Sequence, residues 1–155
     1  MWRSNVSAWW RKRAEGYSRL VAAQAPTDPL LERLSAICLA LPEATREDSG
    51  RHAGFRVRKR TFAYFLDDHR GDEGIVGVVF KAEPGENHAL VSTYPDRFYI
   101  PAYIGPRGWA GLRLDRPPVD WDEVADRVTE SYLLVAPKRL GASVDSLPEA
   151  GRERG

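Results

Sequence analysis

Four cations lie within five residues at Arg56-Val57-Arg58-Lys59-Arg60, the densest charge cluster in the chain. Arginine pairs with phosphate through two parallel hydrogen bonds, and a two-stranded ribbon can enter a DNA groove or lie along the backbone. The cluster therefore predicts phosphate contacts from Arg56, Arg58, Lys59 and Arg60, with nucleic acid as the partner. The alternative is a solvated hairpin whose charges only prevent edge-to-edge pairing with other strands.

A second candidate group combines Arg107, Trp109 and Arg113, together with Lys81. On a strand, Trp109 and Arg113 would share one face, because side chains alternate. An aromatic ring flanked by arginines can stack on a base or accompany a phosphate contact. The alternative is that Trp109 belongs to the core and Arg107 to a tight Gly-Pro turn.

Catalytic and metal-binding patterns are weak. His52, His69 and His88 are far apart and stand in no metal-ligand spacing. The acids at Asp67-Asp68 and Asp72-Glu73 fit no calcium loop and favour a solvated loop. The sequence has no glycine-rich phosphate loop and no nucleophile elbow. We therefore expect no catalysis, no metal and no cofactor.

Length and composition predict one globular domain, since the chain has 155 residues and 43% hydrophobic content. No apolar run approaches the length needed to span a bilayer, so we expect no integral membrane association. The single cysteine, Cys38, excludes an intramolecular disulfide and fits a reducing compartment, so the expected location is cytoplasmic. Cys38 lies on the apolar stripe of an expected helix, which favours an inert core thiol.

Charge is unevenly distributed although the net charge is only +1. Residues 1–27 carry five basic groups and one acid, whereas residues 28–140 carry 16 basic and 18 acidic groups. A uniformly basic surface is the usual electrostatic mark of a nucleic-acid-binding domain. The central domain lacks that mark, so any anionic partner must be met by a local patch.

The elements that position these residues begin with a helix. Asp28-Pro29 predicts its start, since an acidic N-cap followed by proline is favoured there, and Pro42 predicts its end. Residues 43–54 are polar and read as a loop. Alternating residues 55–57 and 61–65 predict a hairpin with Arg58-Lys59 at its tip, although neither is a favoured turn residue. Its core residues are expected to be Phe55, Val57, Phe62 and Tyr64.

The second half predicts a strand over 75–81, a short helix within 84–94, an extended segment over 97–104 and a strand over 109–115. A final helix is expected between Asp120, with its acidic first turn, and Pro137. Residues 141–155 read as a flexible tail. Hairpin-length links predict an antiparallel sheet covered on one face by helices, which is an α+β fold.

Residues 1–27 form a basic N-terminal extension in which Trp9, Trp10 and Tyr17 recur at helical spacing. We expect an amphipathic helix there. It could dock on the domain or on a second copy, or lie on an anionic membrane or DNA.

Between Leu30 and Leu140 the chain resembles the MmcQ/YjbR family. The order and spacing of several short stretches carry the resemblance: Leu41-Pro42-Glu43-Ala44-Thr45, Phe55-Arg56-Val57, Phe62-Ala63, Phe80-Lys81-Ala82, Pro95-Asp96-Arg97-Phe98, residues 101–109, residues 112–115 and Ser131 to Lys138. The resemblance implies a domain over residues 28–140 with an α-β(3)-α-β(2)-α layout. It also implies DNA binding through wing-like hairpins, and no established catalytic residues.

Two departures from that family pattern concern the candidate residues. Many relatives carry glycines where this chain has Arg58-Lys59, so the expected wing gains charge. Many also carry a histidine or asparagine motif where this chain has Arg107-Gly108-Trp109-Ala110.

Other classes of function stay open. An exposed sheet face could receive a protein partner or a second subunit, and the acids of the last helix favour this over DNA: Asp122, Glu123, Asp126 and Glu130. A small-ligand binder would need a deep pocket near Arg107 and Trp109.

Overall fold

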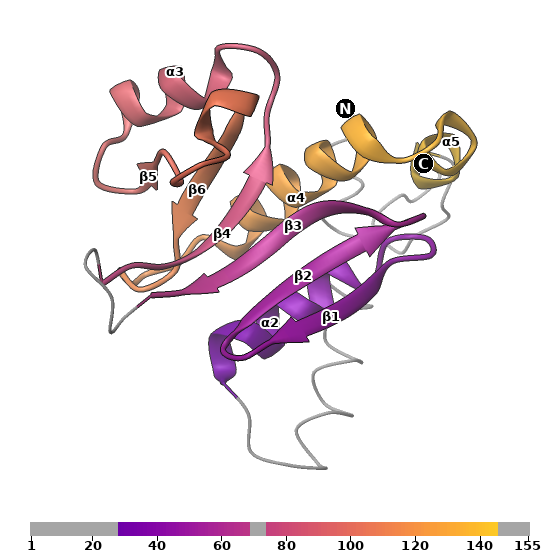
Figure 1. The fold of residues 1–155 in the computed structure, drawn as a ribbon, viewed down its shortest axis with the longest axis horizontal. Coiled ribbons are helices and arrows are strands. Elements are labelled where there is room, and N and C mark those ends of the chain that lie inside the picture. The colour runs from indigo at the N-terminus through magenta and orange to yellow at the C-terminus, as the bar shows by residue number, and fades with distance from the viewer. Residues whose placement is uncertain (1–27, 69–73, 146–155) are drawn as a thin grey trace, which may run out of the picture.

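The computed structural model describes residues 28–68 and 74–145, and the predicted N-terminal helix lies outside them. Figure 1 shows the order of elements. The helices are α2 (Pro29–Cys38), α3 (Glu86–Thr93), α4 (Trp121–Val135) and α5 (Lys138–Asp145), with a 3-10 turn η1 (Gly105–Arg107). The strands are β1 (Thr45–Ser49), β2 (His52–Val57), β3 (Arg60–Asp67), β4 (Val76–Lys81), β5 (Phe98–Tyr99) and β6 (Trp109–Arg113).

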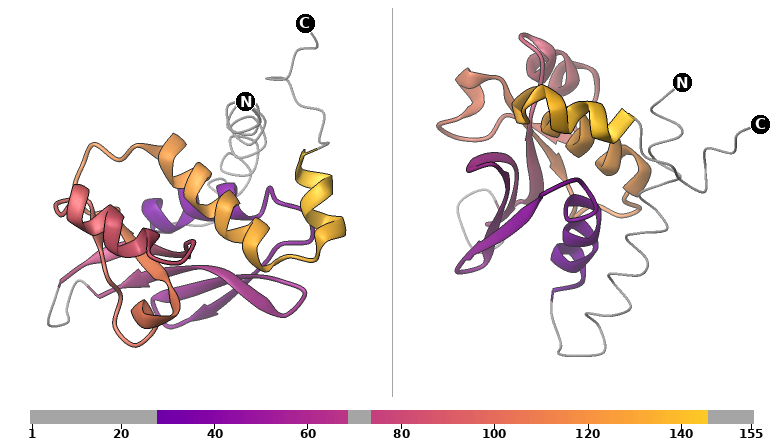
Figure 2. Two further views of the ribbon diagram at one scale, coloured as in Figure 1. Left: turned by 90° about the horizontal axis from the view of Figure 1, so that it is seen from above. Right: turned by 90° about the vertical axis from the view of Figure 1, so that its right-hand side faces the viewer.

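The six strands form one antiparallel sheet in the order β1-β2-β3-β4-β6-β5. Helices α2 and α4 cover one face of the sheet (Figure 2), and the main core lies between them and the strands. This confirms the predicted α+β class. The predicted layout had three strands before the short helix, whereas the structure has four strands, β1 to β4, before α3. None of the described helices is long and apolar enough to cross a bilayer.

Helix α2 begins as predicted, because the Asp28 carboxylate accepts hydrogen bonds from the Leu30 and Leu31 amides at 3.0 and 3.5 Å. It ends at Cys38, earlier than Pro42 predicted. The following residues continue as turns, with Ala40 N–H donating to Ile37 O and Leu41 N–H to Cys38 O. Cys38 is fully buried, and that burial raises the pKa of its thiol.

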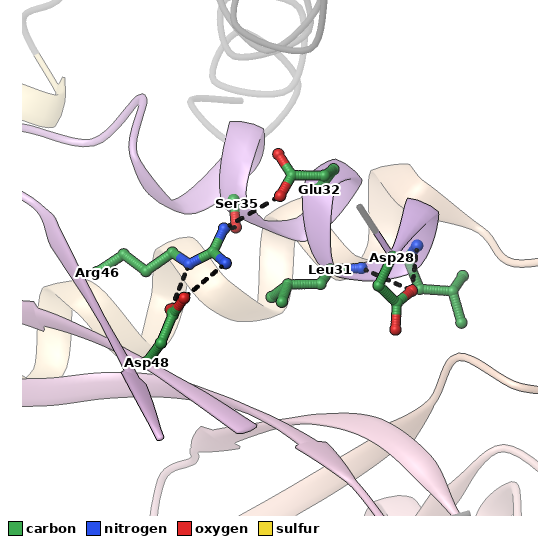
Figure 3. Close-up of polar contacts among 7 residues, drawn as sticks. Asp28, Leu31, Glu32, Ser35, Arg46 and Asp48 are labelled. Carbon is green, nitrogen blue, oxygen red and sulfur yellow. Dashed lines mark hydrogen bonds and ion pairs between the residues drawn. The ribbon is translucent and has the colours of Figure 1, made fainter. Parts of the chain in front are cut away.

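The predicted loop over residues 43–54 is wrong, because it contains β1 and the first part of β2. Strand β1 has no apolar alternation, since the one half-buried position within it is Arg46. The Arg46 guanidinium binds Asp48 at 2.6 and 3.0 Å, Ser35 Oγ at 2.8 Å and Glu32 at 3.3 Å (Figure 3). A polar network therefore ties this edge strand to α2 where a sequence pattern would require a hydrophobic residue.

The predicted β2–β3 hairpin is confirmed, but a β-bulge changes its faces. Pairing shifts by one residue between Phe55 and Arg56, which leaves Phe62 as the extra residue of β3. Phe62, Ala63 and Phe65 are all fully buried. Tyr64 lies half-buried on the opposite face, so its assignment to the main core is wrong. Alternation predicted one face for Phe62 and Tyr64, and the bulge separates them.

Helix α4 is bonded directly into the sheet. The Ser131 hydroxyl donates to Phe62 O at 2.6 Å and accepts from the Lys81 amide at 2.9 Å. It thereby bridges β3 and β4 just beyond their last paired residues, Ala63 and Phe80. One residue along α4, the buried Tyr132 hydroxyl donates to Pro42 O at 2.6 Å, and burial raises its pKa to about 12.

Two further boundaries differ from the prediction. The extended segment over 97–104 contains only a two-residue strand, β5, before its chain turns toward η1. The tail predicted from residue 141 is wrong for residues 141–145, which belong to α5. Leu140 and Val144 of α5 are buried in the core, so they fix this helix to the domain. Residues 146–155 lie outside the described part of the chain.

Candidate nucleic-acid interface

The turn between β2 and β3 holds both of its residues in the left-handed region, with φ of 49° at Arg58 and 68° at Lys59. Positive φ at both central residues is the type I′ pattern, whose twist matches a hairpin and which strongly favours Asn-Gly. A non-glycine residue there costs about 1–2 kcal/mol. The hairpin therefore carries two cationic residues at turn positions whose backbone conformation is unfavourable for most residues other than glycine and asparagine.

Two of the four hairpin cations are engaged by glutamates. Arg58 binds the Glu43 carboxylate through two hydrogen bonds of 2.5 and 3.1 Å, and this pairing lowers the pKa of Glu43. Arg56 binds Glu47 of the neighbouring strand at 3.0 Å and donates to Lys59 O at 3.1 Å. The sequence did not predict these partners. Glu47, for example, lies beside Arg56 only because β1, which was not predicted, pairs with β2.

The other two hairpin cations are available. Lys59 and Arg60 are exposed, and neither has an ion pair or side-chain hydrogen bond with a described residue. Helix α5 begins at the same end of the molecule (Figure 1) with exposed Lys138 and Arg139. Arg139 is close enough to Glu43 to contribute to the lowering of that pKa. The first turn of a helix is the positive end of its dipole, so Lys138 and Arg139 are unfavourably placed there. This unfavourable placement is a feature of the sequence that the prediction did not use.

The second candidate group is not one surface. The register places Trp109, Arg113 and Lys81 on the sheet face away from α2 and α4, as alternation predicts. There Trp109 is only 8% exposed and packs against Tyr64, with ring centroids 5.5 Å apart. Arg113 binds Asp115 through bonds of 3.1 and 2.9 Å, and it lowers the pKa of that carboxyl.

That outer face is closed by its own side chains over β4 and β6. Tyr99 of β5 lies flat against the backbone of Gly111 and Gly77, where any Cβ would collide with its ring. Val79, although it points outward, is fully buried. The open sheet face that a protein partner would need is therefore absent over these two strands.

Lys81 and Arg107 instead line a cavity of about 530 Å³ between the β4–α3 loop and the η1 turn. Their side chains have no ion pair with any described residue. The buried Asn87 fixes the two loops together, because its amide donates to Gly105 O and Trp109 O, both at 3.0 Å. Trp109 itself does not line the cavity.

Side chains suited to metal or redox chemistry do not gather. In the described part of the chain, no group of three or more His, Cys, Asp or Glu could hold a metal ion. His52 accepts a hydrogen bond from the Asp67 amide at 3.0 Å, and His88 borders the cavity. His69, Asp72 and Glu73 lie outside the described residues. The acids of α4 that were expected to favour a protein partner are engaged within the chain, and two of them, Glu123 and Glu130, pair with Arg127 at 3.5 Å.

Within residues 28–68 and 74–145, these elements define a small α+β domain with one antiparallel sheet, two helices on one face and two groups of cations without a described ion-pair partner. The YjbR family model matches residues 39–134, and the chain belongs to the YjbR family. A similar solved structure is that of Deinococcus radiodurans protein DR2400, which carries a DUF419 domain. It is 20% identical, with a TM-score of 0.59 over 79% of this chain and 94% of that chain, and it supports the fold. No curated protein matches the chain.

Proposed function

We propose that this YjbR-family protein binds duplex DNA through its phosphates, without base-sequence preference and without catalysis. The observation that carries the proposal is that Lys59 and Arg60 at the β2–β3 turn are exposed and have no ion pair with any described residue. Exposed cations at a hairpin tip can reach backbone phosphates, and each contact releases counterions from the DNA.

The cost of the turn supports a role in binding. Lys59 occupies a position with φ of 68°, where glycine would be more stable. A residue whose backbone geometry is unfavourable and whose charge pairs with no described residue contributes little to folding. We infer that its charge serves an external anion.

The neighbouring helix end extends the patch. Lys138 and Arg139 are exposed at the start of α5, beside the segment that carries Glu43. Together with Lys59 and Arg60 they form the hairpin–α5 patch, four cations from two elements. Arg56 and Arg58 lie within it but are held by Glu47 and Glu43, so we assign them a smaller share of the affinity.

The test compares two variants that each lose two positive charges, K59A/R60A and K81A/R107A. Anisotropy of a labelled duplex with 5′-hydroxyl ends is measured over a range of salt concentrations. We expect K59A/R60A to bind at least about tenfold more weakly, with a slope of log K against log salt smaller by about 2. The K81A/R107A control should bind as the wild-type protein does.

Two results would overturn the proposal. One is a wild-type affinity that does not change with salt, because phosphate contacts must release counterions. The other is an equal loss in both variants, which would assign the affinity to net charge rather than to the hairpin–α5 patch.

A further inference from the structure

A cavity at the C-terminal end of β4 holds cations that the DNA proposal does not use. Its volume of about 530 Å³ falls in the range of small-molecule sites, and it lies between the β4–α3 loop and η1. Two cations on different segments, Lys81 and Arg107, line it. Neither has a counterion among the described residues.

The register explains why these two side chains meet. Lys81 is paired with Trp109, and the ladder continues one step further because the Ala82 amide donates to Gly108 O at 3.0 Å. Arg107 is the residue before Gly108 and the last residue of η1, so it lies beside the end of β4. Backbone hydrogen bonds thus place these two like charges around one cavity despite their mutual repulsion.

The walls of the cavity are built to hold their shape. Asn87 is 2% exposed, and all its polar atoms are used: its amide bonds Gly105 O and Trp109 O, and its carbonyl accepts from the His88 amide at 2.8 Å. Gly108 adopts φ of 95°, and a Cβ at Gly105 would collide with Ile100. Glycines therefore occupy the left-handed positions of the cavity lining, and the Asn87 hydrogen bonds hold its two loops together.

We propose that this cavity binds a phosphate monoester of about nucleotide size. Lysine and arginine are the usual phosphate-binding side chains, and two of them match the charge of a monoester dianion. The cavity is far larger than one phosphate group, and it is also lined by Pro106 and by Leu134, which is 39% exposed. These apolar surfaces suit the organic part of the ligand, while Glu83 at the rim disfavours a ligand that is anionic throughout.

The same chemistry occurs in a free mononucleotide and in the 5′-phosphate end of a nucleic acid. Backbone amide NMR of the full chain separates these sources and is independent of the DNA proposal. The probes are adenosine 5′-monophosphate, adenosine, and one short oligonucleotide with either a 5′-phosphate or a 5′-hydroxyl end. The signals followed are those of Gly85, Gly105 and Gly108.

We expect saturable shifts of these glycines with adenosine 5′-monophosphate and none with adenosine. The K81A/R107A variant should bind at least about tenfold more weakly, because two charge-assisted contacts are lost. The matched K59A/R60A variant should bind as the wild-type protein does. If only the 5′-phosphorylated oligonucleotide produces the shifts, the ligand is a nucleic-acid end, and the phosphate site is still supported.

Three results would overturn the site. The first is an absence of saturable shifts with both phosphorylated probes at millimolar concentration. The second is equal binding of adenosine and its monophosphate, since the phosphate would then contribute nothing. The third is a K81A/R107A protein that retains its fold, judged by unchanged shifts elsewhere in its spectrum, and binds as the wild-type protein does.

Discussion

The hairpin cluster and the cavity cluster differ in how their cations are held. At the β2–β3 turn, Arg56 and Arg58 are bound by Glu47 and Glu43, and backbone strain falls on non-glycine residues. In the cavity, Lys81 and Arg107 have no counterion within the described part of the chain, and the left-handed positions of the lining are glycines. The hairpin cluster is denser in sequence, but a smaller fraction of its cations is without a described counterion than in the cavity cluster.

This difference shows that charge density along a chain is a poor measure of availability for binding. Neighbouring strands bring counterions beside a dense cluster, as β1 brings Glu47 beside Arg56. Unpaired cations mark a candidate site more directly. We therefore expect substitutions in the shared scaffold, the cavity and the hairpin to differ in their effects on stability and binding.

The largest expected effect comes from Ser131→Ala, which acts on the scaffold that both regions share. Without the hydroxyl, the Phe62 carbonyl and the Lys81 amide both lose their partner. We expect the free energy of unfolding to fall by about 3 kcal/mol. Urea unfolding measures this, with the exposed Ser92→Ala as a control expected to change by less than about 0.5 kcal/mol. Equal midpoints for the two variants would contradict the bridging role.

Asn87→Ala should separate the two regions. The Trp109 carbonyl loses its Asn87 partner and the Gly105 carbonyl keeps only the Gly108 amide, so we expect a destabilisation of about 2 kcal/mol. Binding of adenosine 5′-monophosphate should weaken because the loops loosen, whereas duplex binding should be retained under conditions where the variant is folded. A parallel loss of both activities would show that the regions are not independent.

Lys59→Gly tests the conflict between stability and binding at the turn. Glycine removes the cost of φ at 68°, so the free energy of unfolding should rise by about 1 kcal/mol. Duplex affinity should fall, and the salt slope should decrease by about 0.9. Arg60→Gly is the matched control, because it removes the same charge at a strand residue without positive φ and should not stabilise. If both variants are stabilised, the turn geometry is not the cause.

Glu43→Gln should have the smallest effect and the opposite sign. It releases Arg58 for a phosphate, so duplex affinity should increase a few-fold and the salt slope should steepen by up to about 0.9. Glu83→Gln at the cavity removes the same charge and should leave duplex affinity unchanged. If duplex affinity increased equally in both variants, the cause would be the change in net charge and not the release of Arg58.

The sequence alone determined elements whose signals are local. Asp28 and Asp120 predicted the starts of α2 and α4, because an acidic N-cap acts on amides two and three residues away. Apolar periodicity predicted β4, β6 and the face of α4. The position of the β2–β3 turn was also predicted, although Arg58-Lys59 is an unusual pair for it.

Only the tertiary structure decided what depends on partners distant in the chain. Strand β1 was missed because Arg46 fills its inward position and is satisfied by Glu32 and Ser35 of α2. Tyr64 changed face because a bulge depends on pairing between two strands. The availability of each cation was decided in the same way: Arg56 and Arg58 pair with acids 9 and 15 residues away, and Lys81 and Arg107 pair with none of the described acids. Side-chain type is local, whereas the counterion that neutralises it is supplied by the fold.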